Sequence, residues 1–144
     1  MECVEMKRIL MLFMICLAVL VMNSTSYAEL CCKKLTCKLC VVELRVIKLC
    51  NIEREKRGIA PVKRLKALVD NCRQHSAEQC KRKRMFHGNL KGASCENVAV
   101  GQETADQVVR AWMNSSGHRA NILNRRWKFI GYGKCQKYHT MQCK

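Results

Sequence analysis

Cysteine is the residue type that offers this chain the most chemistry. The sequence contains 12 cysteines in 144 residues, and two of them form the segment Cys37-Lys-Leu-Cys40. This spacing serves zinc binding or thiol redox chemistry in reducing compartments, whereas an oxidising compartment turns such residues into structural disulfides. The chemistry of the cysteines therefore depends on the compartment to which the chain is sent.

The first 28 residues have the layout of a secretory signal peptide. The basic pair Lys7-Arg8 precedes an apolar run over 9–22, and small residues stand at positions 26 and 28. The alternative is a membrane anchor, but this run is shorter than the roughly 20 residues that a membrane-spanning helix needs. We therefore expect cleavage after Ala28 and a secreted, soluble mature chain.

Ten cysteines follow residue 28, and an even number in a secreted chain predicts that all are bridged. The candidates are Cys31, Cys32, Cys37, Cys40, Cys50, Cys72, Cys80, Cys95, Cys135 and Cys143. The sequence leaves their pairing open, with one exclusion. If Cys72 and Cys80 share one helix, their Cα atoms are about 12 Å apart along its axis, beyond the reach of a disulfide.

A second chemical feature is positive charge. Lys and Arg number 27 against 11 Asp and Glu, which gives a net charge of +16. Four cations are consecutive: Lys81, Arg82, Lys83 and Arg84. Such a cluster can bind anionic lipid or polysaccharide, or can simply be a solvated helix end. Secretion argues against a nuclear signal, and we expect no specific nucleic-acid partner.

The sequence contains no recognised hydrolase signature. Neither Gly-x-Ser-x-Gly nor His-Glu-x-x-His occurs. Ser116 and His118 are close in sequence, but such neighbours in a turn rarely form a catalytic dyad. We therefore favour a non-catalytic protein.

The elements that position these residues are helices followed by late strands. One apolar stripe, from Leu65 to Cys80, has clear helical spacing, and Thr104 is a suitable helix N-cap. We expect His75 to be structural in its helix and His139 to lie on a strand surface. The expected helices are 42–57, 65–84, 104–113 and 119–123, and the expected strands are 129–135 and 137–143. A hydrophobic fraction of 49% excludes a disordered basic tail, and this order of elements favours an α+β or three-layer domain.

Residues 50–143 contain a series of short motifs in a fixed order. They are Asn51-Ile-Glu-Arg54 with Gly58 and Pro61-Val62, Phe86-His87, Glu96-Asn-Val-Ala-Val-Gly101, Val108-Val-Arg-Ala-Trp-Met-Asn-Ser115, Gly117-His-Arg-Ala-Asn-Ile-Leu123 and Ile130-Gly-Tyr-Gly133. Together they resemble the CAP superfamily, also called the SCP-like domain, which includes cysteine-rich secretory proteins, insect antigen-5 allergens and plant pathogenesis-related proteins. The motif that begins at Gly117 is similar to the bacterial-type branch of this family. We divide the chain into a signal peptide (1–28), a cysteine-rich lead-in with the start of the first helix (29–49) and a CAP domain (50–144).

The resemblance implies a disulfide-stabilised α-β-α sandwich with a central cavity lined by two histidines and two acidic residues. His87, Glu96 and His118 match three of these four positions. The fourth falls near Ser115, which is not acidic, so Asp106 or Glu103 would have to substitute for it.

Three functions follow from these features. The first is a secreted, non-catalytic binding or defence protein that binds a small apolar ligand such as a sterol or fatty acid. The second is a metal-dependent hydrolase using the His/Glu cavity, and the third is a cationic antimicrobial or anionic-surface-binding protein. No cofactor is required, but His87 and His118 can bind zinc or another divalent ion weakly, and the alternative is a polar cluster in which Glu96 orients a histidine.

Overall fold

The computed structural model describes residues 38–144, with side chains from Val41 onward. The predicted signal peptide and the cysteines Cys31, Cys32 and Cys37 lie outside the described residues, as does the side chain of Cys40. Within this described part of the chain, no helix is both long enough and apolar enough to cross a membrane.

Four helices confirm the helical periodicity of the sequence. They are α2 (Lys38–Glu55), α3 (Lys66–Arg82), α4 (Ala105–Asn114) and α5 (Ser116–Leu123). Helix α2 crosses the boundary at 49/50 that the sequence suggested. Thr104 caps α4 as expected, because its side chain accepts from Gln107 N and the Gln107 side chain reaches back to the Thr104 backbone. Helix α5 begins three residues earlier than predicted, directly after the extended Ser115.

The strands form one four-stranded sheet in the order β1-β3-β4-β2. The strands are β1 (Lys63–Arg64), β2 (Cys95–Val100), β3 (Phe129–Cys135) and β4 (Tyr138–Cys143). The two late strands confirm the prediction and form an antiparallel hairpin, whereas β1 runs parallel to β3. The strands predicted from the sequence did not include β1, because its two residues are too few to give a strand pattern.

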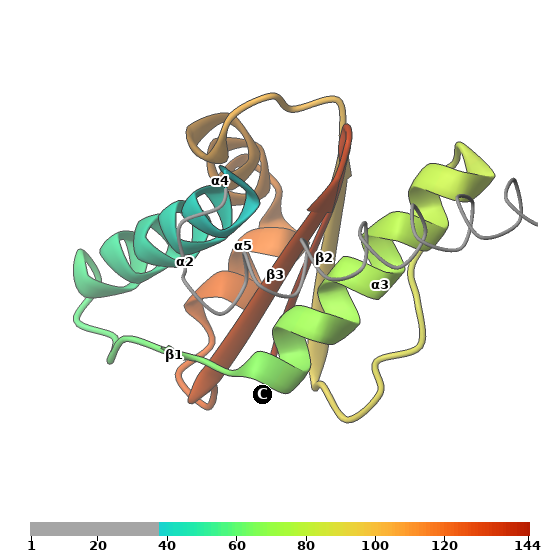
Figure 1. Ribbon diagram of the computed structural model, residues 1–144. Coiled ribbons are helices and arrows are strands. Elements are labelled where there is room, and N and C mark those ends of the chain that lie inside the picture. Colours follow the sequence, from blue (N-terminus) through green and yellow to red (C-terminus); the bar gives the residue numbers. More distant parts are fainter. Residues whose placement is uncertain (1–37) are drawn as a thin grey trace, which may run out of the picture. The chain divides into compact units, whose positions relative to one another are not determined.

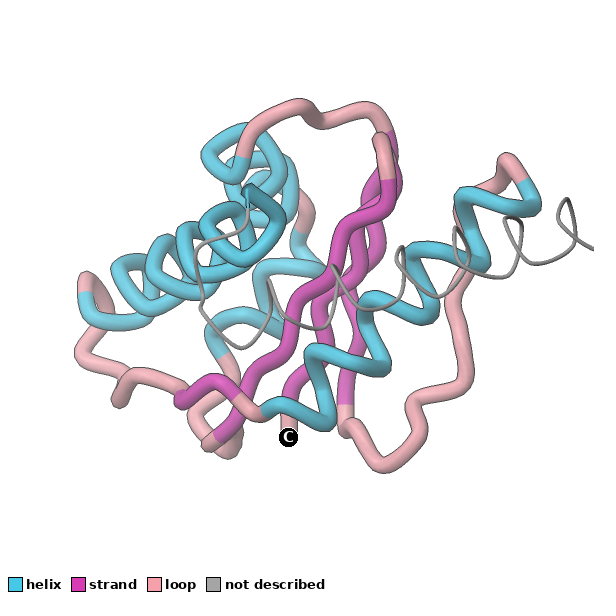
Figure 2. Tube along the Cα trace, in the orientation of Figure 1, coloured by secondary structure: helices cyan, strands magenta, loops and turns pink. Residues whose placement is uncertain are grey.

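The helices cover the two faces of this sheet, which gives the predicted three-layer α-β-α arrangement (Figures 1 and 2). Helix α3 lies along β3 and β4 on one face, and α2, α4 and α5 lie on the other. Side chains alternate along a strand, so Ile130 and Tyr132 point into the core with Trp112. Gly131 and Gly133, which alternate with these two residues, face α3.

Glycine is required at these two positions because α3 approaches the strand very closely. A Cβ atom at Gly131 would lie 2.3 Å from the Leu68 carbonyl carbon, and one at Gly133 would lie 2.3 Å from Arg73 N. No side chain fits at such distances without moving the helix. The Gly131-Tyr-Gly133 segment is therefore what allows the helix layer to lie against the sheet.

A buried arginine connects α2 to the C-terminal end of α5. Arg54 is 1% exposed and donates to the carbonyl oxygens of Ile122 (2.8 Å), Asn124 (2.9 Å) and Ala60 (2.9 Å). Carbonyls at a helix C-terminus lack intrahelical partners and carry partial negative charge. The guanidinium satisfies them and so fixes α5 against α2, although burial lowers the pKa of Arg54.

The expectation for His139 was wrong, because this residue is buried at 1% exposure. Its Nε2 bonds the Gln102 carbonyl (2.9 Å) and its Nδ1 bonds the Tyr132 hydroxyl (2.7 Å). Nε2 therefore donates and Nδ1 accepts, so the ring is neutral. Burial lowers its pKa to about 4 and raises that of Tyr132. Hydrophobic patterning missed this residue because two specific partners offset the cost of burying the imidazole.

The pKa of His139 predicts acid sensitivity of the fold. Below the ordinary histidine pKa of about 6.5, His139 binds a proton in the unfolded chain but stays neutral in the folded chain. The free energy of unfolding should therefore fall by about 3 kcal/mol as the pH drops from about 6.5 through about 4. Urea unfolding at several pH values measures this change. The slope should flatten in His139→Gln and persist in Lys137→Ala, and identical slopes in all three proteins would contradict the prediction.

Candidate functional site

The candidate site is built around the carboxylate of Glu96, the second residue of the edge strand β2. This side chain is 2% exposed. Its Oε1 accepts from His87 Nδ1 (3.0 Å) and from the backbone N–H of Gly88 (2.9 Å). Its Oε2 accepts from Gln142 Nε2 on β4 (3.0 Å). The buried carboxylate thus holds both its neighbouring strand and the loop that carries His87.

The contact with Glu96 determines the orientation of His87. A carboxylate accepts hydrogen bonds, so Nδ1 of His87 carries a proton, and in the neutral imidazole Nε2 is the nitrogen with the lone pair. No described residue bonds this Nε2, and the His87 side chain is 64% exposed. The imidazole therefore presents an electron pair to solvent, in the arrangement by which a carboxylate commonly orients a metal-binding histidine.

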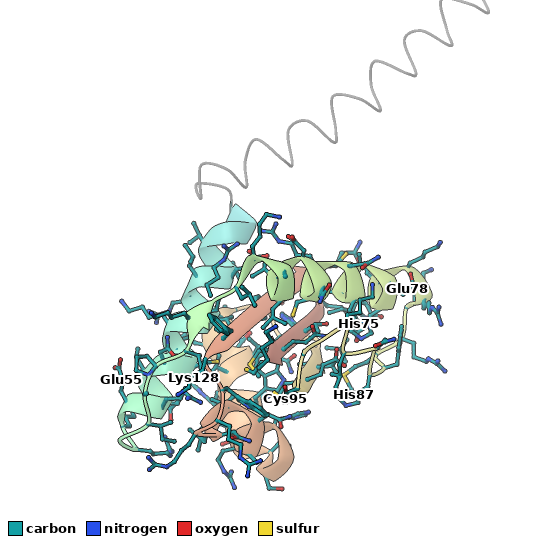
Figure 3. The ribbon with its side chains drawn as sticks, turned by 90° about the horizontal axis from the view of Figure 1, so that it is seen from below. Glu55, His75, Glu78, His87, Cys95 and Lys128 are labelled. Carbon is teal, nitrogen blue, oxygen red and sulfur yellow. The ribbon has the colours of Figure 1, made fainter. Side chains whose placement is uncertain are left out.

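Helix α3 supports the same loop through His75, as the structural interpretation of that residue predicted. His75 Nε2 donates to the Phe86 carbonyl (2.9 Å), and the His75 ring lies edge-on to the Phe86 ring. A Cβ atom at Gly88 would lie 2.6 Å from His75 Nδ1. Figure 3 shows His75 and His87 at the same end of the molecule. Gly88 is therefore required so that the loop can lie against the ring and donate to Glu96.

His118 is positioned from the other face of the same strand. Asn97 follows Glu96, so its side chain points to the opposite face of β2. It is fully buried and donates from Nδ2 to the His118 carbonyl (3.0 Å), while its Oδ1 accepts from Asn121 (2.8 Å). Two consecutive residues of β2 thus hold the His87 imidazole and the His118 backbone.

The two histidines lie within electrostatic reach of each other. Partial burial, and then the charge of His87, lower the pKa of His118. A lowered pKa keeps the His118 imidazole neutral, and therefore able to bind a metal ion, at a lower pH than an ordinary histidine. The structure thus brings His87 and Glu96 into contact and places His118 near them.

In the described part of the chain, the contacts of the two acidic candidates for the fourth cavity position do not join the His/Glu cluster. Asp106 is on α4, but its carboxylate is half exposed and bonds Arg45 of α2 at 3.0 Å, so the proposed substitution by Asp106 is wrong. Glu103 precedes α4, where its N–H bonds Gln107 Oε1 (2.9 Å) and its carbonyl accepts from Lys134 (3.0 Å). Among residues 38–144, no group of three or more His, Cys, Asp or Glu side chains is arranged to hold a metal ion.

Sequence reasoning missed the amides that hold the site together. Three side-chain amides donate to residues of the site. Asn97 bonds the His118 carbonyl, Asn121 bonds the Glu96 carbonyl and Gln142 bonds the Glu96 carboxylate. The first two were within segments quoted for the family resemblance, but amides at these positions carry no recognisable chemical motif. Gln142 was read as part of a strand, and its pairing opposite Glu96 depends on a register that the sequence does not reveal.

The fold has relatives among known proteins. Residues 47–142 match the family described as CAP: Cysteine-rich secretory protein family. The chain belongs to this family. One similar protein is the uncharacterized protein YkwD of Bacillus subtilis, 35% identical over 106 residues that cover 63% of this chain and 41% of that protein. The uncharacterized membrane protein YlbC of the same organism is 26% identical over 68% of this chain and 33% of its own length. The CAP domain therefore spans less than half of either relative.

Solved bacterial structures share the fold. An extracellular SCP-domain protein of Bacillus anthracis has a TM-score of 0.68 at 22% identity, covering 73% of this chain and 40% of that one. An outer surface protein of Borrelia burgdorferi has a TM-score of 0.60 at 16% identity, covering 69% of this chain and 89% of its own. These matches show the shared fold, and the similarity to YkwD supports the bacterial-type assignment of the domain.

Proposed function

We propose that this CAP domain is a secreted, non-catalytic binding protein whose binding site is the pair His87 and His118. The observation that carries the proposal is the buried Glu96 carboxylate at 3.0 Å from His87 Nδ1, which leaves Nε2 facing outward. An imidazole fixed in this way loses little conformational freedom when it binds a ligand. The site is therefore pre-organised to donate electron pairs.

Donors of this type favour a divalent transition metal ion such as zinc. The residues present fit such an ion in part: two imidazoles are available, and Glu96 serves to orient one of them. A structural zinc site has four protein ligands. Two protein ligands predict weak, exchangeable binding, with the remaining positions open to water or to a donor from a partner.

The hydrolase alternative has less support from the same geometry. A metal-dependent hydrolase needs a general base with an accessible oxygen near the site. Glu96 is buried, and its two oxygens accept three hydrogen bonds from His87, Gly88 and Gln142. Glu96 is therefore better suited to orienting a histidine than to accepting a proton from water.

Zinc titration of the oxidised full-length chain tests the proposed site. Calorimetry should show weak binding that is lost in both His87→Ala and His118→Ala, because each removes one of two ligands. Affinity should also fall as the pH drops below the ordinary histidine pKa of about 6.5, with protonation of His118 displaced to lower pH, because protons compete for the imidazoles. Chelation should leave the unfolding temperature almost unchanged, unlike that of a zinc finger.

Arg110→Ala, an exposed substitution on α4, is the matched control and should bind like wild type. Any zinc bound by cysteines is common to all four proteins, so the differences report the histidines alone. Equal binding in all four proteins would remove the metal site. Zinc-dependent turnover of a hydrolysable substrate would instead favour the hydrolase.

Secretion is supported by the predicted signal peptide and by two structural relatives, one described as extracellular and one as an outer surface protein. A role for a small apolar ligand such as a sterol or fatty acid stays a prediction from the family resemblance.

A second candidate function is binding to anionic surfaces. Lys81, Arg82, Lys83 and Arg84 are all exposed at the end of α3. Met85 is also exposed, at 45%, and the guanidinium groups of Arg82 and Arg84 lie 5.2 and 5.7 Å from the centre of the Phe86 ring. The fold thus displays the basic cluster beside an apolar side chain, which suits an anionic polymer or lipid surface.

Replacing all four cations with Gln should weaken binding to heparin and to anionic vesicles, because it removes the local charge. This variant should elute from a heparin column at a lower NaCl concentration than wild type. The matched control replaces four scattered, exposed cations, Arg110, Arg126, Lys137 and Lys144, with Gln. If both variants elute together, net charge alone explains binding and the cluster is a solvated helix end.

A further inference from the structure

Six cysteines lie in the part of the domain with described side chains, and all are thiols without an Sγ–Sγ contact at disulfide distance. The expectation that every cysteine is bridged therefore stays a prediction. The six residues are Cys50, Cys72, Cys80, Cys95, Cys135 and Cys143. Their positions nevertheless separate them into two neighbouring pairs and two further buried thiols.

The first pair is Cys95 and Cys143, which are direct partners in the antiparallel register of β2 and β4. Such partners have Cα atoms about 4.5–5.5 Å apart, within the range that a disulfide spans. Both side chains lie in the core on the face that α4 and α5 cover. The Cys143 thiol bonds Cys95 and is the main cause of the lowered pKa of Cys95.

The second pair is Cys80, in the last turn of α3, and Cys135, at the end of β3. Cys135 faces α3 because it follows Gly133 by two residues. Helix and strand advance together, since Gly131 lies against Leu68 and Gly133 lies against Cys72 and Arg73. Four helical residues rise about 6 Å and two strand residues about 6.7 Å.

Continuing this register places Cys135 opposite residues 76–77, one turn before Cys80. Side chains of a helix lean toward its N-terminus, and the Cys80 thiol bonds that of Cys135. Burial first, and then this bond, raise the pKa of Cys135 to about 11. The sulfur contact and the register therefore agree on the partner.

The remaining two cysteines are separated by the sheet. Cys50 belongs to the core on the α2, α4 and α5 side, whereas Cys72 is on α3. Both are 0% exposed. Burial raises the pKa of Cys50 to about 12 and that of Cys72 well above its usual value. Buried thiols of this kind are unreactive and pack as small apolar groups.

We propose that the domain contains two disulfides, Cys80–Cys135 and Cys95–Cys143, and retains Cys50 and Cys72 as buried thiols, in place of the expectation that every cysteine is bridged. The pairing rests on the proposed secretion, which supplies an oxidising compartment, but not on the proposed histidine site. Each bridge forms by exchange with an external disulfide such as glutathione disulfide. A protein thiolate attacks one sulfur and releases one thiol, and its partner then displaces the second, so one S–S bond is exchanged for another.

The location of the bridges gives them a role at the site. The loop carrying His87 runs between Cys80 and Cys95, so the two bridges fix both of its ends to the sheet. Cys95 and Cys143 also flank Glu96 and Gln142, which bond each other at 3.0 Å. The bridges therefore stabilise the same framework that orients His87.

Peptide mapping of the full-length chain tests the pairing directly. The protein is equilibrated with glutathione disulfide, alkylated while folded, then denatured, alkylated with a second isotopic reagent and digested without reduction. We expect peptides that link Cys80 to Cys135 and Cys95 to Cys143, with Cys50 and Cys72 carrying the second label alone. Other partners for Cys80 or Cys95, or four unlinked thiols, would overturn the proposal.

Thermal unfolding gives an independent measurement. Reductant should lower the unfolding temperature of the oxidised protein by roughly 10 °C or more, because it reopens two long loops. Replacing Cys80, Cys135, Cys95 and Cys143 with Ser should abolish most of that shift, whereas Cys50→Ala should retain it. An equal shift in the quadruple variant would assign the effect to bridges outside this domain and would contradict the proposal.

Discussion

The buried carboxylate of Glu96 is the interaction on which the candidate site depends. It receives hydrogen bonds from a loop histidine, a loop backbone N–H and the Gln142 side chain of the neighbouring strand. A buried carboxylate is costly unless it is paired or well hydrogen-bonded. The loop must therefore lie where Gly88 and His87 can satisfy the Glu96 oxygens, and this requirement fixes the histidine.

The edge position of β2 explains how two histidines from distant segments meet. Neighbouring residues of a strand point to opposite faces, so Glu96 holds the loop after α3 while Asn97 holds α5. A central strand would place these two supports in separate layers. At the edge, His87 and His118 come close enough for the charge of one to affect the pKa of the other.

Much of the architecture was predictable because its signals are local. Helical spacing, the Thr104 cap and the paired late strands gave the positions of the main elements, and the motif order gave the family. Contacts that depend on register were not predictable, including the burial of His139 between Tyr132 and Gln102. The same holds for Asp106, which bonds Arg45 on a distant part of the chain.

The candidate residues His87, Glu96 and His118 came from the family resemblance, because their separation in sequence gives no physical reason to group them. The structure adds the roles that the sequence left open. Glu96 orients a histidine, and its oxygens are already engaged by three donors. The site is therefore described better as two histidines held on a rigid support than as a ring of equivalent ligands.

The tautomer of His87 tests this account most directly. Long-range ¹H–¹⁵N NMR of the full-length chain at pH 8.5, where imidazoles are neutral, distinguishes the two ring nitrogens. His87 should carry its proton on Nδ1, because Glu96 accepts from that atom. His75 and His139 should carry theirs on Nε2, where each bonds a backbone carbonyl, and so serve as internal controls. A His87 proton on Nε2 would contradict the account, because Glu96 would then not hold the lone pair outward.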